Sequence, residues 1–455
     1  MQRIRKIGEL HPVQIIVLSF LSAILLGTFL LMLPQASTGE PLGFVNALFE
    51  ATSAVCVTGL IVVDTGTRLT LFGQLVILAL IQAGGLGIMT LSTIFLLIAG
   101  KKLSIRTRAI VQESLSQHPI KKLRQLMMHV FLFTFGIEFL GALFMLLRWL
   151  FSLPPKQALY YAIFHAISAF CNAGFSPFSE SLMAYEGDVV INLVVTSLII
   201  TGGIGFYVLI DLRMAAAAKL SRRKSRLSFH TKVVLWTTLS LIIFGFLATF
   251  LLEIDNLLKD KPFLTKILAA YFQAVTPRTA GFNTLDTGRL TNATLMLVFI
   301  LMFIGASPTS CGGGIKTTSF SIQLGAFWAA LRGRERLELF KRFVSSEVVS
   351  RASAVTLTSL IVVLIGVMLL SITELGEHSH AEVRGSFLEL TFEVISAFGT
   401  VGLSTGVTPK LSTLGRLIIT FIMFIGRAGP LSMAIAIRPT GERRYEYAEE
   451  NLMVG

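Results

Sequence analysis

The chain has 455 residues, of which 53% are hydrophobic and only 14% are charged, and its formal net charge is +13. A water-soluble protein of this length needs more charged residues to cover its surface, so the composition excludes an ordinary soluble globular domain. Repeated apolar runs of about 20 residues, each long enough to cross a bilayer, predict a multi-pass membrane protein instead.

Most of the lysine and arginine residues gather in five segments: 1–12, 101–124, 213–232, 332–351 and 438–455. Cytoplasmic loops of membrane proteins carry an excess of basic residues, which predicts that all five segments, and both termini, lie in the cytoplasm. The positive charge is then explained by topology and by contact with anionic lipid, and it does not indicate nucleic-acid binding. Because 332–351 also contains three glutamates, we expect an amphipathic surface helix there.

The apolar runs form four pairs, and each pair encloses a shorter apolar segment. The eight predicted spans are residues 13–33, 71–99, 130–151, 189–210, 233–252, 293–327, 355–371 and 414–437. The predicted fold class is an all-α polytopic membrane protein of four repeated units, each made of a span, a re-entrant pore helix and a span. The units are predicted at 1–100, 101–219, 220–331 and 332–437, followed by a cytoplasmic tail at 438–455.

A short motif recurs between the two spans of every pair. Its four copies are FEATSAVCVTGL at 49–60, FHAISAFCNAGFS at 164–176, YFQAVTPRTAGFNT at 271–284 and FEVISAFGTVGLST at 392–405. Each copy is a mostly apolar segment followed by a turn of small residues that ends on a glycine, and the third copy is one residue shorter before its turn. An apolar helix of about 10 residues reaches only about half way across the hydrocarbon core, so the segment must turn back at membrane depth. Irregular backbone at that depth is tolerated only against protein or a water-filled cavity.

Four such turns around one axis would present rings of backbone carbonyl oxygens, which can replace the water shell of a monovalent cation. Glycine permits the required backbone and keeps side chains out of the pore, while the negative end of each short helix dipole faces the centre. The turns carry no carboxylate, which favours a large monovalent cation over a divalent one. The predicted filter residues are Val57, Thr58, Gly59, Asn172, Ala173, Gly174, Thr279, Ala280, Gly281, Thr400, Val401 and Gly402.

The sixth predicted span contains the stretch GASPTSCGGGIK at 305–316, where a proline and three successive glycines break any helix. This span is predicted to be two helices joined by a movable loop just below the filter. Two cations, Lys316 and Arg427, lie at membrane depth, where a charge is costly and usually functional or paired. We expect Arg427 to face the pore, repelling cations or holding the loop by its carbonyls; the alternative is pairing with a distant carboxylate. The predicted gate residues are Gly305, Gly312, Gly313, Gly314, Lys316 and Arg427.

Several polar residues near the turns have weaker assignments. Glu50, His165 and Glu393 occupy matching repeat positions and are predicted to hydrogen-bond the turns from behind. Asp64 and Asp286 each follow a filter glycine by five residues and are predicted at the outer mouth, where they would concentrate cations. Glu138 lies inside an apolar span, and the sequence assigns it no role.

The four turns and the stretch 305–318 make the chain resemble the Trk/Ktr/HKT superfamily of cation transporters, most closely its Ktr-type membrane subunits, over essentially its whole length. The resemblance implies a pseudo-fourfold pore for K⁺ uptake across the bacterial cell membrane, gated by the intramembrane loop 305–316. It also implies a homodimer and a separate cytoplasmic regulatory ring that binds nucleotides. The resemblance implies K⁺ as the transported ion. The chain itself has no phosphate-binding motif, so no organic cofactor is expected in it, and any nucleotide control must come from a partner.

Three alternatives remain open at this point. The nearest is a Na⁺-permeable or Na⁺-coupled member of the same superfamily; members with a serine in the first turn tend toward Na⁺, so Gly59 favours K⁺. The ion-carrying subunit of a K⁺-pumping ATPase shares the fourfold plan, but the short chain and the three-glycine loop disfavour it. An intramembrane enzyme would need a carboxylate dyad, a histidine cluster or a nucleophile with its base at one depth, and the intramembrane acidic and histidine residues are scattered.

Overall fold

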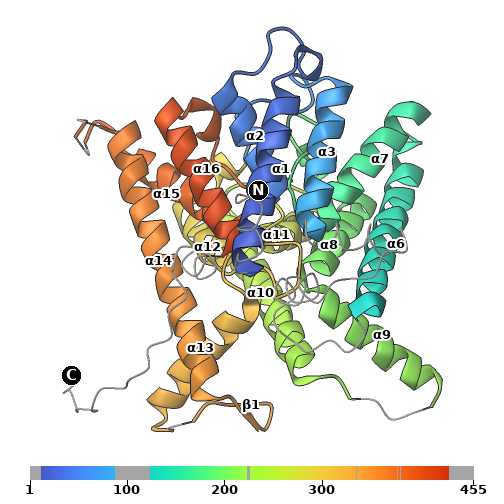
Figure 1. Cartoon of the computed structure of the whole chain (residues 1–455), viewed down its shortest axis with the longest axis vertical. Helices are drawn as coiled ribbons and strands as arrows, with labels where there is room; N and C mark the ends of the chain where they lie inside the picture. The colour runs from blue at the N-terminus through green and yellow to red at the C-terminus, as the bar shows by residue number, and fades with distance from the viewer. Residues whose placement is uncertain are drawn as a thin grey trace, which may run out of the picture.

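The computed structural model describes residues 12–87, 123–222, 226–334, 336–376, 378–379 and 381–429. Its regular structure is almost entirely helical (Figure 1), as the sequence predicts. The helices are α1 (Pro12–Leu31), α2 (Phe44–Cys56), α3 (Leu71–Leu86), α6 (Leu123–Trp149), α7 (Pro155–Phe170), α8 (Val189–Gly203), α9 (Phe206–Leu220), α10 (Phe229–Glu253), α11 (Phe263–Val275), α12 (Asn292–Phe303), α13 (Thr317–Leu331), α14 (Ser346–Glu374), α15 (Ser386–Gly399) and α16 (Thr413–Ala428). Short 3₁₀ turns lie at Pro34–Ala36, Met183–Tyr185, Thr287–Arg289 and Thr408–Lys410.

The helices fall into four groups in chain order: α1–α3, α6–α9, α10–α13 and α14–α16. Within each group a short helix (α2, α7, α11 or α15) packs against a long one. Between groups, α3 contacts α7, α8 contacts α11, α12 contacts α15, and α16 returns to contact α2. In each group the helix that follows the short one (α3, α8, α12 or α16) therefore packs on the short helix of the next group. These contacts close into a ring.

Long helices lie on the outside of this ring and leave their apolar side chains uncovered. Within the described ranges, α1, α6, α10 and α14 are long and apolar enough to cross a bilayer, and α8 with α9 would add a fifth span if the bent pair were counted as one. Less than a third of the apolar stretch is buried inside the protein in α1, α6 and α14, and about a third in α10. This uncovered surface suits lipid, and the number of eight spans stays a prediction.

In each group the helix that follows the short one begins at a hydroxyl or carboxylate cap. The side chains of Thr70, Asp188, Thr291 and Ser412 each accept a hydrogen bond from the backbone N–H three residues later, at the starts of α3, α8, α12 and α16. Such caps satisfy backbone donors that a helix start leaves unpaired. The same kind of N-cap therefore fixes the first residue of α3, α8, α12 and α16.

One predicted span is wrong in its extent. The span expected at 189–210 ends at Gly203, and the chain bends by 102° into α9. The bend occurs at Gly205, whose φ of 94° is accessible mainly to glycine, and an added Cβ there would collide with the carbonyl oxygen of Pro308. The sixth span does divide into α12 and α13 as predicted, while residues 88–99 and 430–437 of two other spans lie outside the described residues.

The all-α prediction needs a second correction at 332–351. The expected amphipathic helix is absent from this part of the described chain, which instead forms an antiparallel hairpin of β1 (Glu338–Leu339) and β2 (Arg342–Phe343) before α14 begins. Phe340 and Lys341 between the strands both have positive φ, the two-residue turn whose twist suits a hairpin. The hairpin and α9 lie at the same lower end of the molecule in Figure 1, which brings two of the basic segments to one face.

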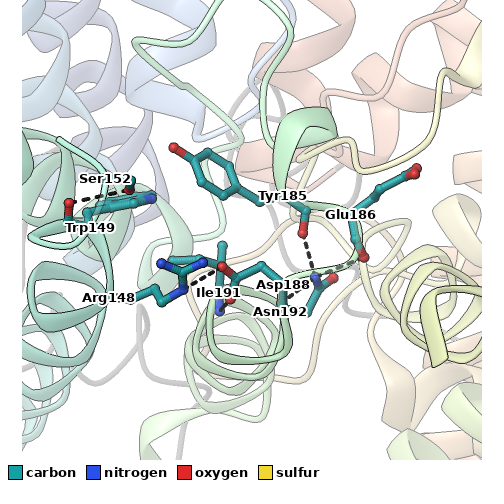
Figure 2. A network of polar contacts seen from close by, with 8 residues as sticks. All are labelled: Arg148, Trp149, Ser152, Tyr185, Glu186, Asp188, Ile191 and Asn192. Carbon is teal, nitrogen blue, oxygen red and sulfur yellow. Dashed lines mark hydrogen bonds and ion pairs between the residues drawn. The ribbon is translucent and has the colours of Figure 1, made fainter.

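A polar and aromatic cluster fastens the end of α6 to the start of α8 (Figure 2). The guanidinium of Arg148 lies 2.7 Å from the carboxylate of Asp188, and the amide of Asn192 donates to the carbonyl oxygen of Tyr185 at 2.8 Å. The fully buried ring of Trp149 packs edge-on against Tyr185 and His165. Because His165 belongs to α7, the cluster also fixes the short helix of this group.

Candidate ion filter and gate

The four short helices end in turns that follow one backbone path. Two residues before each repeat glycine the chain adopts the left-handed conformation, at Val57, Asn172, Thr279 and Thr400, with φ between 50° and 71°. The glycines themselves, Gly59, Gly174, Gly281 and Gly402, have φ between 70° and 92°. Residues 57–59, 172–174, 279–281 and 400–402, called turns 1 to 4, therefore share a conformation although their sequences differ.

The four glycines meet one another in a closed ring. A Cβ added to any of them would lie less than 3.0 Å from the carbonyl oxygen of the residue before the next glycine, a distance real Cβ atoms do not adopt. The approaches are Gly59 to Ala173, Gly174 to Ala280, Gly281 to Val401 and Gly402 to Thr58. Glycine is thus required twice, for its positive φ and for the close approach of neighbouring backbone.

Carbonyl oxygens of the ring are free to bind a ligand. Within the described ranges, no N–H or O–H group is hydrogen-bonded to the carbonyl oxygens of Thr58, Ala173, Ala280 or Val401. All four glycines line a single cavity of about 270 Å³. Buried carbonyl groups nearly always have a partner, so four unpaired oxygens next to glycines that line a cavity make a candidate site for a cation or water.

Acidic residues surround the opening of this cavity. Asp286, predicted at the mouth, lines it, and so does Glu180, which the sequence analysis missed. Asp64 lies beside the cavity: partial burial acts to raise its pKa, but hydrogen bonds from Ser179 and Thr67 outweigh burial and hold the pKa below its usual value. The carboxylate of Asp64 is therefore ionised at neutral pH and adds negative potential near the mouth.

A repeated hydroxyl at or near the C-terminal end of each short helix supports the turn that follows. Ser53 and Ser396 accept hydrogen bonds from the N–H groups of Gly59 and Gly402, at 3.0 and 3.1 Å. In the other two copies the hydroxyl is a donor: Ser168 bonds the carbonyl oxygen of Phe175, and Thr276 bonds that of Phe282, at 2.8 and 2.7 Å. The sequence analysis did not single out these residues, although aligned repeats show Ser or Thr at this position in all four copies.

The three residues predicted to hydrogen-bond the turns from behind bond instead the segments that follow the turns. Glu50 accepts hydrogen bonds from the N–H groups of Val62 and Val63, at 2.8 and 3.1 Å. His165 is hydrogen-bonded to Ser176 at 2.9 Å. Glu393 accepts hydrogen bonds from the hydroxyls of Thr408, at 2.7 Å, and Ser404. Each of these contacts joins a short helix to the segment that follows its turn, so turns 1, 2 and 4 are held on both sides.

The loop 305–316 lies directly against two of the turns. An added Cβ at Gly312 would collide with the hydroxyl of Thr279, and one at Gly313 would collide with that of Thr400. The N–H of Gly313 donates to the Thr400 hydroxyl at 3.0 Å. On its other side the loop is held by α8, because the N–H groups of Ser307 and Cys311 donate to the last carbonyls of that helix at 3.0 and 3.2 Å. Gly305 packs on the backbone of Gly313 and Gly314, which folds the loop on itself.

Both predicted gate cations bond carbonyl oxygens. The guanidinium of Arg427 donates to the carbonyls of Cys311 in the loop and Gly84 at the end of α3, and it lies 5.9 Å from the ring centre of Phe20. The ammonium of Lys316 donates to Gly312 at 2.8 Å. Neither forms an ion pair with a carboxylate in the part of the chain that the structure describes. Arg427 thus joins group 4, the loop of group 3 and group 1.

The sequence analysis assigned no role to two buried charged residues, Glu138 and Arg278. Glu138 on α6 is only 4% exposed and accepts hydrogen bonds from the amide of Gln82 at 3.1 Å and the thiol of Cys171 at 3.9 Å. Arg278, directly before turn 3, is 7% exposed, and its guanidinium donates to the hydroxyl of Thr238 at 3.5 Å. A charge inside a filter-like motif was a visible signal for Arg278, whereas the Gln82–Glu138 pair joins residues too far apart in sequence to be recognised.

Comparison with known proteins decides the family. Residues 6–443 match the family model TrkH, described as "Cation transport protein". The chain belongs to the TrkH family. The resemblance stated from the sequence is therefore confirmed, and a transporter family with several apolar helices makes the chain a membrane protein.

Curated relatives of this TrkH-family chain match almost end to end. It is 44% identical to "Ktr system potassium uptake protein B" of Bacillus subtilis (strain 168), covering 98% of this chain and 97% of the relative. It is 37% identical to "Potassium/sodium uptake protein NtpJ" of Enterococcus hirae, covering 100% of this chain and 99% of the relative. The crystal structure of "the Potassium Transporter TrkH from Vibrio parahaemolyticus" matches with a TM-score of 0.72 at 19% identity, covering 94% of this chain and 84% of that chain, and shows the same fold.

Proposed function

We propose that this chain is the ion-conducting membrane subunit of a bacterial K⁺ uptake system, in which turns 1 to 4 form the selectivity filter. The observation that carries the proposal is the ring of four turns: their glycines line one cavity, and the carbonyl oxygens of the preceding residues accept no hydrogen bond among the described residues. Relatives that are similar over almost their whole length are named potassium uptake proteins, which supports K⁺ as the ion. No organic cofactor is proposed, and K⁺ is the cargo.

In this proposal K⁺ loses its water shell as it enters the ring. The carbonyl oxygens of Thr58, Ala173, Ala280 and Val401 replace the water, and the negative ends of the four short helices favour the positive charge. Asp64, Glu180 and Asp286 raise the cation concentration at the mouth. The hydroxyls and carboxylates behind the turns hold the ring at a fixed size, so that the smaller Na⁺ is coordinated less well.

The gate is proposed to be the loop 305–316 with Arg427 and Lys316. Contacts of the loop with turns 3 and 4 support a position directly in the path that an ion takes after the filter. A fixed guanidinium at this depth repels a passing cation by about 4 kcal/mol at a separation of about 4 Å and an effective dielectric constant of about 20. Opening then requires the loop and the guanidinium to separate.

The membrane arrangement and assembly follow from the same proposal. The chain crosses the bacterial cell membrane eight times in the four units 1–100, 101–219, 220–331 and 332–437, with both termini and the tail 438–455 in the cytoplasm. The basic segments support this orientation. A homodimer with a cytoplasmic nucleotide-binding ring is proposed as the working assembly, and the word "system" in the name of the Bacillus relative supports more than one component.

A Na⁺-permeable or Na⁺-coupled transporter is the second candidate. The observation that favours it is the whole-length similarity to a relative named for both potassium and sodium uptake. Gly59 in turn 1, which leaves no side chain in the ring, favours K⁺.

Rubidium uptake into proteoliposomes tests the proposal. Labelled Rb⁺ uptake should be blocked by excess K⁺ and spared by excess Na⁺, and Gly402→Ser should weaken this discrimination because a Cβ at Gly402 collides with the backbone of turn 1. Gly43→Ser is the matched control, since nothing lies within 4 Å of an added Cβ there. Equal competition by Na⁺ would favour the second candidate, and no uptake by the fully assembled system would overturn both.

A further inference from the structure

Thr400 has two separate relations to the ion path. Its backbone belongs to turn 4, while its hydroxyl accepts a hydrogen bond from the N–H of Gly313 in the loop at 3.0 Å. Both residues are buried. Gly313 has to be glycine for this approach, because a Cβ would collide with that same hydroxyl.

The filter conformation does not require a hydroxyl at this position. Val57 occupies the equivalent place in turn 1, with φ of 58° against 50° for Thr400. Its aliphatic side chain is also β-branched and also fully buried. A valine can therefore adopt this backbone and fill this space in the same ring, and the hydroxyl of Thr400 needs another explanation.

The hydroxyl of Thr400 is explained by the loop 305–316, which contacts the four turns unequally. The loop 305–316 comes from group 3 alone, and it touches only the left-handed residues of turns 3 and 4, Thr279 and Thr400, among the described contacts of its glycines. The hydroxyl of Thr279 is hydrogen-bonded to the side chain of Asn172, at 3.1 Å. Among the hydrogen bonds of the described residues, the one from Gly313 to Thr400 alone joins the loop backbone to a filter turn.

Other bonds to the loop come from outside the filter. Arg427 bonds the carbonyl oxygen of Cys311, and the end of α8 accepts from Ser307 and Cys311. These contacts fix the loop to the surrounding helices. The bond to Thr400 differs because it ends one residue before Val401, whose carbonyl oxygen belongs to the ring.

We propose that the Thr400 hydroxyl is a latch, a positioning group that holds the closed loop against turn 4 and couples loop opening to the filter. This proposal rests on the gate role proposed above for 305–316. Breaking one buried hydrogen bond of this kind changes an equilibrium by about five-fold, so loss of the hydroxyl shifts the loop toward its open state by about that factor.

The test uses Thr400→Val in proteoliposomes, in a background where Cys56 and Cys171 are replaced by alanine. Cys311 is then the one thiol left, since the chain has three cysteines, and its rate of reaction with a membrane-impermeant maleimide reports how often the loop leaves its closed position. We expect labelling of Cys311 and K⁺-competed Rb⁺ flux each to rise about five-fold. Thr400→Ser, which restores a hydroxyl, should return both toward the parent values.

Thr391→Val, on the helix that directly precedes Thr400, is the matched control, because the Thr391 hydroxyl bonds its own helix, at Phe387. Labelling of Thr400→Val at the parent rate, in protein with the parent elution profile and thermal midpoint, would overturn the latch. So would a fall in K⁺/Na⁺ discrimination without faster labelling, which would make Thr400 a filter residue alone. Labelling does not depend on flux: faster labelling without Rb⁺ flux in any variant would keep the latch and reject the proposed transport function.

Discussion

Replacement of Arg427 by glutamine should release the loop. The guanidinium donates to two carbonyl oxygens, those of Cys311 and Gly84, and thereby bridges the loop to α3. A hydrogen bond to a charged group contributes about 1.5–3 kcal/mol, so the pair contributes at least about 3 kcal/mol to the closed arrangement. A glutamine amide that keeps one neutral bond retains about 1 kcal/mol. The net loss of about 2 kcal/mol corresponds to a rise of about 30-fold in the opening equilibrium.

Rb⁺ efflux from proteoliposomes measures this rise, and the loss of a positive charge beside the path acts in the same direction. Arg416→Gln is the matched control, because Arg416 lies on the same helix and also donates two bonds, to Asn46 and Pro409, away from the loop. Efflux from the Arg427 variant equal to that of the parent, at equal reconstitution and thermal midpoint, would refute the assignment of Arg427 to the gate. Slower efflux would indicate that the arginine supports the open path.

Two further predictions concern the filter and its mouth. Ser396→Ala leaves the N–H of Gly402 without its partner, which should cost about 1–3 kcal/mol and lower both the thermal midpoint and the K⁺/Na⁺ competition ratio. Ser22→Ala, at an exposed serine bonded to its own helix, should change neither, and an unaltered ratio in Ser396→Ala would show that this bond does not shape the ring. Asp64 has a pKa below its usual value, so its stabilising effect is present above about pH 4 and is lost as the pH falls through the lowered pKa. Asp64→Asn should therefore flatten the fall in thermal midpoint between about pH 5 and pH 3, and an identical acid limb in variant and parent would contradict this.

Much of the candidate site was readable from the sequence because the motif is repeated. Four copies place a glycine, a small residue and a left-handed residue in the same order, and the backbone of all four is the same. The break between α12 and α13 was also predictable, since no helix continues through Pro308 and three glycines. Each of these signals depends on a few consecutive residues, so it can be recognised from the sequence.

Other features depend on distant partners or on single residues. The 102° bend after Gly203 follows from one glycine and from the neighbouring carbonyl of Pro308, a contact that no sequence pattern predicts. The hairpin at 338–343 rests on two residues with positive φ, neither of them glycine. The latch at Thr400 looks like any filter threonine until Gly313 is placed beside it.

A ring made from one chain can change one quarter at a time. In a ring of four identical subunits every substitution appears four times, so a loop inserted below the filter would be present in four copies competing for the same axis. Here the four groups contribute similar turns but different neighbours: Val57, Asn172, Thr279 and Thr400 stand at equivalent places with different chemistry. Because the four turns belong to one chain, each quarter can change alone, and the loop 305–316 can come from group 3 by itself.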